Sequence, residues 1–519
     1  MKVCILAAGT GSRMGAFGRT VHKALLPLDN QAVIGRIIGQ FSARDEFVIA
    51  VGHKKDQIKD YLAAAYPRRH FTFVNVNDFD GPGAGPGRSL FACRARLREP
   101  FIFTACDTLI TSALPALRRN WLGVKKVPDI GNWCSAKVDG LGRVRKLAYK
   151  VKAQTDLAFA GIAFVKDYRA FWEGLGRNRA LLGGELQVNS GLEALMGRGL
   201  KAEPVKWEDA GSEENYRALL KRYSPNYSFD GKTTDVTYRH DSRIIKFFAD
   251  PATSRLRYER GLRNKGAFAS VRQLNGGFYS YDFVQGKPLA DSLDGRSCRS
   301  FLEWAQRRLW REAPVSGPEF EPVARQFYYQ KTLGRLKAFR AKNLPGGKEA
   351  HCVINGLKCL PAEELLGKLS PAFYDSALPS AYHGDLHDSN IIVTGKSSYT
   401  LIDWRESFGS SVDTGDRYYD LAKFLHTLNF SVEAMKHGRY QCRLKGKKAA
   451  IGHGISPRRR KAMEAFWSFV KEAGYDAERI RLIEALIYLN MSPLYDKELG
   501  LYLYYLGRYS LQRHLAGWS

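Results

Sequence analysis

Asp385, Asn390 and Asp403 are the residues whose types and spacing most directly suggest chemistry. The first two lie in the sequence HGDLHDSN at residues 383–390, and two β-type runs follow, the second of which delivers Asp403. In such a hairpin Asp385 could take a proton from a substrate hydroxyl, while Asn390 and Asp403 supply the oxygen ligands that Mg²⁺ needs between nucleotide phosphates. The pattern predicts phosphoryl transfer. The alternative is a turn rich in Asp, Asn and His that only caps a helix.

A loop of small residues near the N-terminus is a second candidate site. It follows an apolar strand-like run at residues 3–6 and includes Ala8, Gly9, Gly11, Ser12 and Arg13. Small side chains let backbone N–H groups approach phosphates, and an arginine adds a charge-assisted contact. A lysine, Lys23, follows just before an apolar turn. A dinucleotide-binding turn competes with this interpretation, although the spacing differs from GxGxxG.

Alternating strands and helices must position these residues in the first half of the chain. Apolar strand-like runs occur at residues 47–51, 71–76 and 100–106, and a helical run begins at Asp56. Asp107 directly follows the last of these strands. An acid at the carboxyl end of a strand lies where open α/β sheets bind ligands, so Asp107 is a candidate site residue.

The sequences LAAGTGSRM (residues 6–14) and KALLPL (residues 23–28) together resemble nucleotidyltransferases that activate sugar phosphates or phosphocholine with an NTP. The resemblance implies that Asp107 and Asp209, the latter in the sequence WEDAG, clamp one Mg²⁺ on the α-phosphate. Arg13 and Lys23 would offset charge as the substrate phosphate attacks and pyrophosphate leaves. One departure is Cys106, because the family has glycine before the first aspartate.

The same resemblance places a nucleotide-base loop at the Gly- and Pro-rich run of residues 81–87. Gly85 and Ser89 are therefore candidate nucleotide-binding residues. This run is richer in Gly and Pro than the family pattern, so the selected base stays open, and a plain flexible loop is the alternative.

Residues 383–390, with Ile402, Asp403 and Trp404, are similar to the catalytic and metal-binding segments of aminoglycoside phosphotransferases and choline kinases. These enzymes share the protein-kinase fold and phosphorylate small molecules. The resemblance implies that Asp385 is the catalytic base and that Asn390 and Asp403 bind Mg²⁺. It also implies that an aspartate before a helix braces the catalytic loop. The candidates are Asp416 and Asp420, for which ordinary first-turn acids are an equal alternative.

Three further residues could bind ATP in a kinase-like unit. Lys246 lies in an apolar strand, where an unpaired lysine is costly, and Glu259 in the next helical run is its expected partner. Phe283 lies in a run that ends at Gly286 and resembles the hinge that reads adenine. Taken singly, Lys246 and Glu259 could be surface charges.

Composition bounds the remaining possibilities. The 519 residues carry a net charge of +28, which suggests nucleic-acid binding as one hypothesis. The charges are scattered, with clusters at residues 68–69 and 458–461 among them, and no nucleic-acid module surrounds them. A basic surface that attracts anionic substrates is favoured. The eight cysteines show no CxxC pair, so we expect reduced thiols. No run of eighteen apolar residues occurs, so we expect no membrane span. Residues 1–6 predict a strand rather than a secretory signal, and we therefore expect a cytoplasmic protein.

The expected fold class is α/β. A Rossmann-like nucleotidyltransferase at residues 1–222, with a mixed sheet flanked by helices, precedes a two-lobed α+β protein-kinase-like fold. Its small lobe is expected at 223–286 and its helical large lobe at 287–519, with a boundary near Pro225.

The expected function is sequential. The kinase phosphorylates a small alcohol with ATP, and the nucleotidyltransferase then couples the phosphate monoester to an NTP. The two resemblances favour CTP and a choline, ethanolamine or polyol acceptor, for decoration of surface polysaccharide or lipid. The tyrosines after residue 475 could form an aromatic box for a quaternary amine, although core packing is favoured. A sugar-1-kinase fused to a sugar-1-phosphate nucleotidyltransferase is one alternative, and a nucleic-acid-binding or regulatory protein on degenerate enzyme folds is another.

Overall fold

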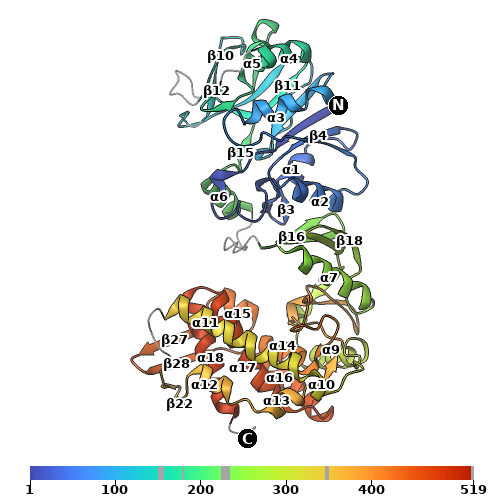
Figure 1. Cartoon of the computed structure of the whole chain (residues 1–519), viewed down its shortest axis with the longest axis vertical. Coiled ribbons are helices and arrows are strands. Elements are labelled where there is room, and N and C mark those ends of the chain that lie inside the picture. The colour runs from blue at the N-terminus through green and yellow to red at the C-terminus, as the bar shows by residue number, and fades with distance from the viewer. Residues whose placement is uncertain (132, 150–156, 178–180, 224–233, 345–349, 516–519) are drawn as a thin grey trace. The chain divides into compact units, whose positions relative to one another are not determined.

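The computed structural model of the chain describes residues 1–131, 133–149, 157–177, 181–223, 234–344 and 350–515. The chain divides into two compact units, whose elements are labelled in Figure 1. The first unit comprises Met1–Arg255 and Arg272–Tyr281, and the second comprises Leu256–Val271 and Asp282–Ser519. The boundary expected near Pro225 lies outside the described residues. The division at residues 222 and 286 stays a prediction.

A mixed sheet forms the centre of the first unit. Its main path runs β10-β9-β11-β6-β1-β4-β5, and β8 and β14 extend it from β11. β1 pairs in parallel with β4 and β6, whereas β11 pairs antiparallel with β6. The expected α/β fold with a mixed sheet is thus confirmed for this part of the chain. The strands are β1 (Lys2–Ala7), β4 (Glu46–Val51), β5 (Phe71–Asn75), β6 (Phe101–Ala105), β8 (Trp121–Lys126), β9 (Cys134–Val138), β10 (Val144–Tyr149), β11 (Leu157–Val165) and β14 (Lys201–Pro204).

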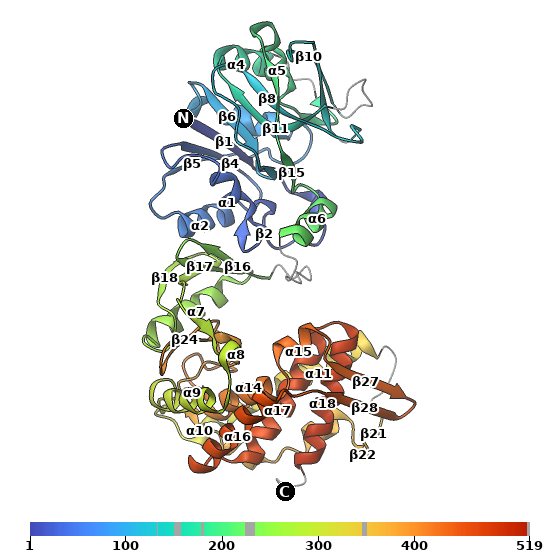
Figure 2. The same cartoon turned by 180° about the vertical axis from the view of Figure 1, so that it is seen from behind.

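Helices cover both faces of this sheet because its strands are apolar on both sides. Val3, Ile5 and Ala7 of β1 join one apolar cluster, and Cys4 joins the other, as expected for side chains that alternate along a strand. The first cluster includes residues of α1 (Val33–Ile38), α2 (Lys55–Ala65) and α6 (Glu213–Tyr223). The second includes residues of α3 (Pro86–Ala92), α4 (Tyr168–Arg177) and α5 (Asn189–Glu193). Figure 2 labels α1, α2 and α6 of the first set and α4 and α5 of the second.

Short elements of the first unit lie beside the sheet. They are η1 (Ser12–Met14), η2 (Lys23–Leu25), β2 (Pro27–Leu28), β3 (Gln31–Ala32), η3 (Arg94–Arg96), β7 (Thr108–Ile110), β12 (Leu181–Leu182), β13 (Glu185–Leu186), η4 (Met196–Arg198) and β15 (Trp207–Asp209). β7 and β15 pair antiparallel. This pairing matters for the site, because it joins segments about 100 residues apart.

A separate four-stranded sheet follows in the sequence, in the order β16-β17-β19-β18. Its strands are β16 (Asp235–His240), β17 (Arg243–Phe248), β18 (Val271–Asn275) and β19 (Phe278–Asp282), and α7 (Pro251–Arg263) connects β17 to β18. The expected strand around Lys246 and the expected helix around Glu259 are both present. Most of the sheet belongs to the first compact unit.

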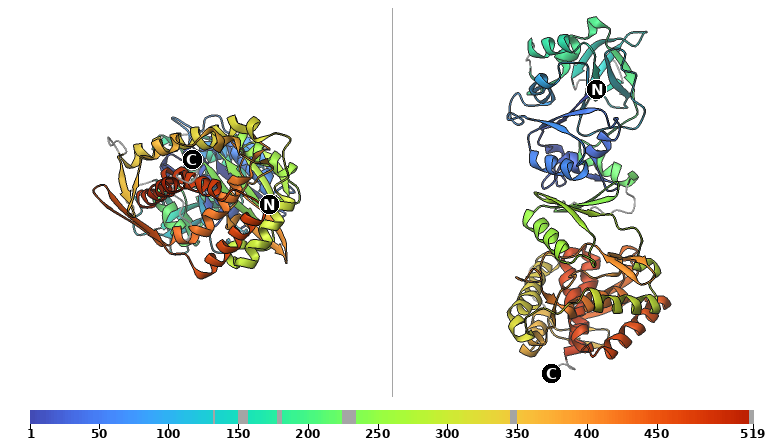
Figure 3. Two further views of the ribbon diagram at one scale, coloured as in Figure 1. Left: turned by 90° about the horizontal axis from the view of Figure 1, so that it is seen from below. Right: turned by 90° about the vertical axis from the view of Figure 1, so that its right-hand side faces the viewer.

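Helices dominate the second unit. They are α8 (Leu289–Ser292), α9 (Gly295–Arg308), α10 (Gly317–Arg325), the π-helix η5 (Gln326–Gln330), α11 (Lys331–Asn343), α12 (Ala362–Gly367), α13 (Pro371–Asp375), α14 (Arg417–Asn429), α15 (Val432–Lys436), α16 (Pro457–Glu472), α17 (Ala477–Met491), η7 (Ser492–Leu494) and α18 (Lys497–Leu515). α17 and α18 pack along one another, and both belong to the red, C-terminal end of the chain in Figure 3. Tyr488, Tyr502 and Tyr504 of these helices are buried, and Tyr504 stacks on Phe339. These tyrosines pack in the core, as the sequence analysis favoured over an aromatic box.

Three small sheets complete the second unit. β20 (Lys287–Pro288), β24 (Ile391–Gly395) and β25 (Ser398–Leu401) form one, and β23 (Pro379–Ser380) pairs with β26 (Gly415–Asp416). The third has the order β22-β21-β28-β27, from β21 (Cys352–Ile354), β22 (Leu357–Cys359), β27 (Tyr440–Lys445) and β28 (Lys448–His453). The short 3-10 helix η6 (Asp388–Asn390) precedes β24.

All eight cysteines are free. Among the described helices, none combines the length and the apolar character that crossing a membrane requires.

Candidate active sites

Sheet topology brings the N-terminal loop and Asp107 to one edge of the first unit. β1 and β6 are parallel neighbours, so the loop after β1 and the turn after β6 both lie at their carboxyl ends. Asp209 reaches the same edge through β15, whose register sets it opposite Thr108 of β7. The Ala210 N–H donates to the Asp107 carbonyl at 2.9 Å, which fixes this junction.

The side chains of Lys23, Asp107 and Asp209 converge at this edge. Lys23 Nζ lies 2.6 Å from Asp107 Oδ2. A Cβ placed on Gly211 would lie 2.7 Å from Asp107 Oδ2 and 2.9 Å from Asp209 Oδ1, so both carboxylates approach one point. Asn215 Nδ2 donates to Asp209 Oδ2 at 2.6 Å and orients this carboxylate from α6. The structure therefore brings together three residues that the sequence singled out.

The two carboxylates have different protonation behaviour. For Asp107, burial favours the neutral form, but the charge of Lys23 outweighs it and lowers the pKa. For Asp209, burial and then the charge of Asp107 raise the pKa. Lys23 is buried as well, which opposes its charge, yet the charge of Asp107 raises its pKa. The cation of Lys23 and the two carboxylates therefore lie close together, in an arrangement that a bound cation and a polyphosphate could change.

The small-residue loop lies directly against this charged group. Gly11 has a φ of 70°, and a Cβ there would contact the Lys23 stem at 3.5 Å, so the turn favours glycine. Ala8 is buried, whereas Gly9, Ser12 and Arg13 are exposed. The charge of Arg13 lowers the pKa of both Asp107 and Asp209, which places the guanidinium near both carboxylates.

Mg²⁺ fits the two carboxylates of this edge. Asp107 and Asp209 converge at the glycine that leaves room between them, and carboxylate oxygens with substrate phosphate oxygens are the ligands that Mg²⁺ uses. Within the described residues no group of three or more His, Cys, Asp or Glu side chains is arranged to hold a metal, so a two-carboxylate site needs the substrate to complete it.

The expected base loop lies farther along the same unit. Gly85 has a φ of 116°, and a Cβ there would lie 2.9 Å from Cβ of Glu185, so the loop packs against β13. Ser89 is buried in α3, and its hydroxyl donates to the Gly85 carbonyl at 3.2 Å. That bond shows a structural use of Ser89, and base recognition by this loop stays a prediction.

A cavity of about 330 Å³ borders Asp209 and includes residues that the sequence did not single out. Trp133 and Trp207 form an edge-to-face pair at 4.6 Å along its wall. Lys125 and Arg222 add positive charge to the lining. Because these side chains come from four separate segments, their convergence leaves no local sequence pattern.

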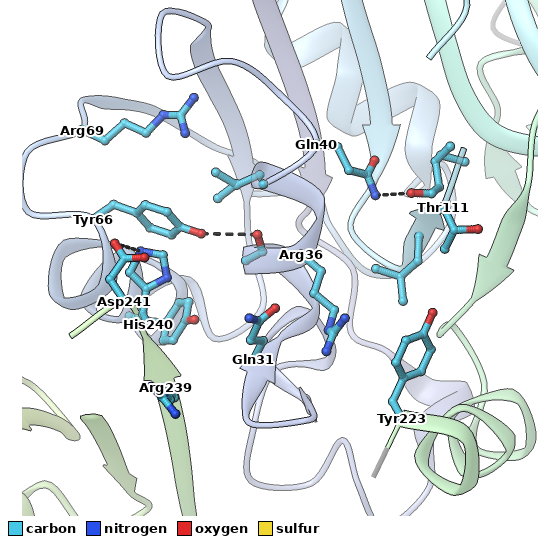
Figure 4. A pocket seen from close by; sticks show the side chains of 16 residues that line it. Gln31, Arg36, Gln40, Tyr66, Arg69, Thr111, Tyr223, Arg239, His240 and Asp241 are labelled. Atoms are coloured by element: carbon cyan, nitrogen blue, oxygen red, sulfur yellow. Dashed lines mark hydrogen bonds and ion pairs between the residues drawn. The ribbon is translucent and has the colours of Figure 1, made fainter. Parts of the chain in front are cut away.

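A larger cavity of about 460 Å³ lies elsewhere in the first unit (Figure 4). Figure 4 shows Tyr66, His240 and Asp241 on one side and Arg36 and Tyr223 on the other. Arg36 packs over the Tyr223 ring at 4.9 Å and donates to the Leu28 carbonyl. The residues expected to carry chemistry line other parts of the unit.

In the second unit, the predicted hairpin is confirmed. β24 pairs with β25 in a register that sets Ile391 opposite Leu401, so Asn390 and Asp403 flank the same end. The Ile402 N–H donates to the Asn390 carbonyl at 3.0 Å. Asp403 has a φ of 60°, which is uncommon for a residue other than glycine and is frequent at functional turns. Asn390 Nδ2 donates to the Asp385 carbonyl at 3.0 Å.

Asp385 is held ionised by a lysine that sequence analysis missed. Lys423 Nζ of α14 lies 2.9 Å from Asp385 Oδ1, and His387 Nε2 lies 3.8 Å from Oδ2. Burial would favour the neutral acid, but the charges of Lys423 and His387 outweigh it and lower the pKa of Asp385. Lys423 lies 38 positions beyond Asp385, and no motif connects the two.

Asp420, within the first turn of α14, braces the loop that carries Asp385. Its carboxylate accepts from the backbone N–H groups of His383 at 2.7 Å and Gly384 at 2.8 Å. Asp416, which stands before the helix, instead caps it through the Tyr418 N–H and pairs with Arg479 at 2.7 Å. Of the two candidates, the bracing residue is Asp420.

The largest basic run is partly structural. Arg459 pairs with buried Asp388 at 2.7 Å and donates to the Thr427 carbonyl at 2.6 Å. This central member of residues 458–461 therefore stabilises the loop beside Asp385.

The expected ATP-binding residues fall in different units. Lys246 is buried in β17 of the first unit, whereas Glu259 belongs to the second unit and pairs with Arg263 at 3.6 Å. Phe283 follows the end of β19. The Lys246–Glu259 pair and the hinge role of Phe283 stay predictions.

Comparisons with known proteins bear on the first unit. Residues 3–124 match the sequence profile of the MobA-like NTP transferase domain, a range that contains Arg13, Lys23 and Asp107. Among solved structures, a UDP-glucose pyrophosphorylase complexed with UDP-glucose is 19% identical with a TM-score of 0.39, covering 44% of this chain and 99% of that one. A UDP-glucose pyrophosphorylase from Acinetobacter baumannii is 14% identical with a TM-score of 0.37, covering 44% and 95%. No curated protein matches the chain.

Proposed function

We propose that this chain is a bifunctional enzyme with a nucleotidyltransferase in its first unit and a small-molecule kinase in its second. The convergence of Lys23, Asp107 and Asp209 at the carboxyl edge of the sheet carries the proposal. The NTP-transferase profile at residues 3–124 supports the first activity. The second activity, and the kinase-like fold that it implies, rest on the geometry around Asp385.

In the first unit, a phosphate monoester attacks the α-phosphorus of an NTP, and the bond to the departing pyrophosphate breaks. Backbone N–H groups of the loop after β1 and the Arg13 guanidinium face the triphosphate. Lys23, which lies 2.6 Å from Asp107, would offset charge on the phosphates. Asp107 and Asp209 would hold Mg²⁺, which supplies Lewis-acid shielding of phosphate charge. No protein nucleophile is required.

In the second unit, a substrate hydroxyl attacks the γ-phosphorus of ATP, and the bond to ADP breaks. Asp385 accepts the hydroxyl proton, and its lowered pKa keeps it ionised for that role. Asn390 and Asp403 would hold Mg²⁺, which would offset the charge of the ATP phosphates. Asp420 fixes the backbone that carries the base.

The two proposed activities are tested by the products that they release. Purified protein is incubated with ATP, a panel of alcohols and each NTP, and ADP, pyrophosphate and nucleotide conjugates are measured by mass spectrometry. The proposal expects ADP to form first and pyrophosphate to follow. Pyrophosphate release from an NTP and a supplied phosphate monoester without any alcohol-dependent ADP would remove the kinase step from the proposal.

The finer assignments belong to the same proposal. CTP as the NTP and a role in surface polysaccharide or lipid decoration follow from the sequence resemblance. The cytoplasmic location stays a prediction from the sequence. The alternative pair of a sugar-1-kinase and a sugar-1-phosphate nucleotidyltransferase uses the same residues, and the panel separates the two.

A further inference from the structure

A cavity of about 410 Å³ in the second unit lies beside the loop that carries Asp385. Its lining includes Phe327, Lys331 and Arg405. Arg405 connects the cavity to the catalytic loop, because a Cβ on Gly384 would lie 2.9 Å from Cβ of Arg405 and 3.0 Å from its Cδ. Gly384 directly precedes Asp385, so a ligand in this cavity lies near the proposed base.

An aromatic ring holds two cations at the cavity. Lys331 Nζ lies 3.9 Å from the centre of the Phe327 ring, and the Arg405 guanidinium lies 5.5 Å from it. Phe327 in turn stacks on Phe408 at 3.8 Å. Phe327 belongs to the π-helix η5, and such helices are frequent at functional sites because the extra residue redirects side chains.

Positive charge exceeds negative charge around this cavity. Burial lowers the pKa of Lys331, and the charges of Arg405, Arg335 and Lys423 lower it further. The nearby carboxylates are already engaged. Asp385 pairs with Lys423 at 2.9 Å, and Glu406 pairs with Arg257 at 2.9 Å and lies 3.8 Å from the Arg405 guanidinium. Among the described residues, Lys331 and Arg335 have no carboxylate within ion-pair distance, and the buried Arg405 Nε has no hydrogen-bond acceptor.

We propose that the acceptor of the second unit is an anionic alcohol, whose carboxylate or phosphate is bound by Lys331 and Arg405 while its hydroxyl faces Asp385. Crowded cations with unused donors are costly unless an anion neutralises them. A quaternary amine would meet repulsion here, which opposes the choline acceptor that the resemblance suggested. The inference rests on the proposed kinase function for the role of the hydroxyl, whereas the anion site itself does not.

Titration calorimetry of the full chain tests the anion site. The probes are D-glycerate and glycerol 3-phosphate, with glycerol as the neutral match and choline as the cationic one. We expect at least one anion to bind tenfold or more tightly than glycerol, and the two anions distinguish carboxylate from phosphate. Anions that bind no better than glycerol, or choline that binds best, would overturn the proposal.

Two substitutions on α11 locate the binding. Lys331→Met should weaken anion binding at least tenfold, while Lys337→Met, an exposed lysine on the same helix, should leave it unchanged. Affinity for a non-hydrolysable ATP analogue should change less than twofold in either variant. If Lys331→Met weakens the ATP analogue instead of the anion, the cluster serves nucleotide phosphates and the inference fails.

ATP turnover separates this inference from the proposed function. Lys331-dependent anion binding without ADP formation would refute the kinase and leave the anion site standing. ADP formation with glycerol or choline in preference to the anions would support the kinase and refute the anionic acceptor.

Discussion

The candidate site of the first unit gathers Lys23, Asp107 and Asp209 from segments about 100 residues apart, whereas Asp385, Asn390 and Asp403 of the second lie in a single hairpin. Their charge balance differs as well. In the first, two converging carboxylates face Lys23 and Arg13. In the second, cations outnumber the available carboxylates around one proposed base. A carboxylate pair suits a metal and a polyphosphate, while a cation-rich wall suits an anionic substrate.

The sharpest test of this contrast is a reciprocal loss of activity. Asp385→Ala should reduce alcohol-dependent ADP formation by about 10²–10⁴-fold, because a positioned general base contributes that much. Asp107→Asn should reduce pyrophosphate release to a similar degree, because it removes a proposed Mg²⁺ ligand. Each variant is assayed for both activities, with ready-made phosphate monoester supplied for the second. Loss of both activities in a folded single variant would show that the sites are not separable.

Removing a buried ion pair should destabilise the second unit without affecting the first. Arg479 and Asp416 are both fully buried and 2.7 Å apart. Arg479→Met leaves the Asp416 charge unpaired and should cost about 3–5 kcal/mol of stability. Urea denaturation followed by fluorescence measures it, and pyrophosphate release from the first unit should persist.

The matched control is Arg481→Met, which removes a partly exposed pair with Glu478 on the same helix. Its cost should be about 0–1 kcal/mol. Equal destabilisation by both variants would contradict the role given to burial.

A carboxylate of the second unit should behave opposite to Asp107. Burial raises the pKa of Glu484 from its ordinary value of 4.5 to about 7. The folded state therefore keeps this proton while the unfolded state releases it, so stability falls as pH rises from 4.5 towards 7 and then levels. Glu484→Gln should remove up to about 3 kcal/mol of that fall.

Denaturation midpoints between pH 4.5 and 8 measure the effect, with the exposed Glu464→Gln as control. A Glu484→Gln curve parallel to that of the unchanged protein would refute the raised pKa.

The smallest expected effect concerns the space between the first unit's carboxylates. Gly211→Ala would place a Cβ less than 3 Å from both Asp107 and Asp209, so one must shift. A displacement of this kind should lower pyrophosphate release by about 10–100-fold, since an error of about 1 Å can cost 10²-fold. Gly140→Ala, where a Cβ meets no atom within 4 Å, is the control. An unchanged rate for Gly211→Ala would mean that the carboxylates do not act together.

Local sequence patterns were sufficient to predict many of the strands and turns near the two candidate sites. The strand before the small-residue loop, the strand before Asp107 and the hairpin after Asn390 all form where the sequence predicts them. Each depends on residues close in the chain, such as alternating apolar side chains. The hairpin β21–β22 lies in a stretch expected to be mainly helical, where two strands of three residues leave little periodic signal.

Tertiary structure decided which residues act on one another. The sequence alone indicated an α/β first half, a loop that suits phosphates and the individual candidates Lys23, Asp107, Asp209 and Asp385. The pairing of Asp385 with Lys423, the choice of Asp420 over Asp416 as the brace and the crowding of Lys331 with Arg405 arise between separate elements. A linear pattern carries no record of such contacts, because they depend on how helices and strands pack rather than on spacing along the chain.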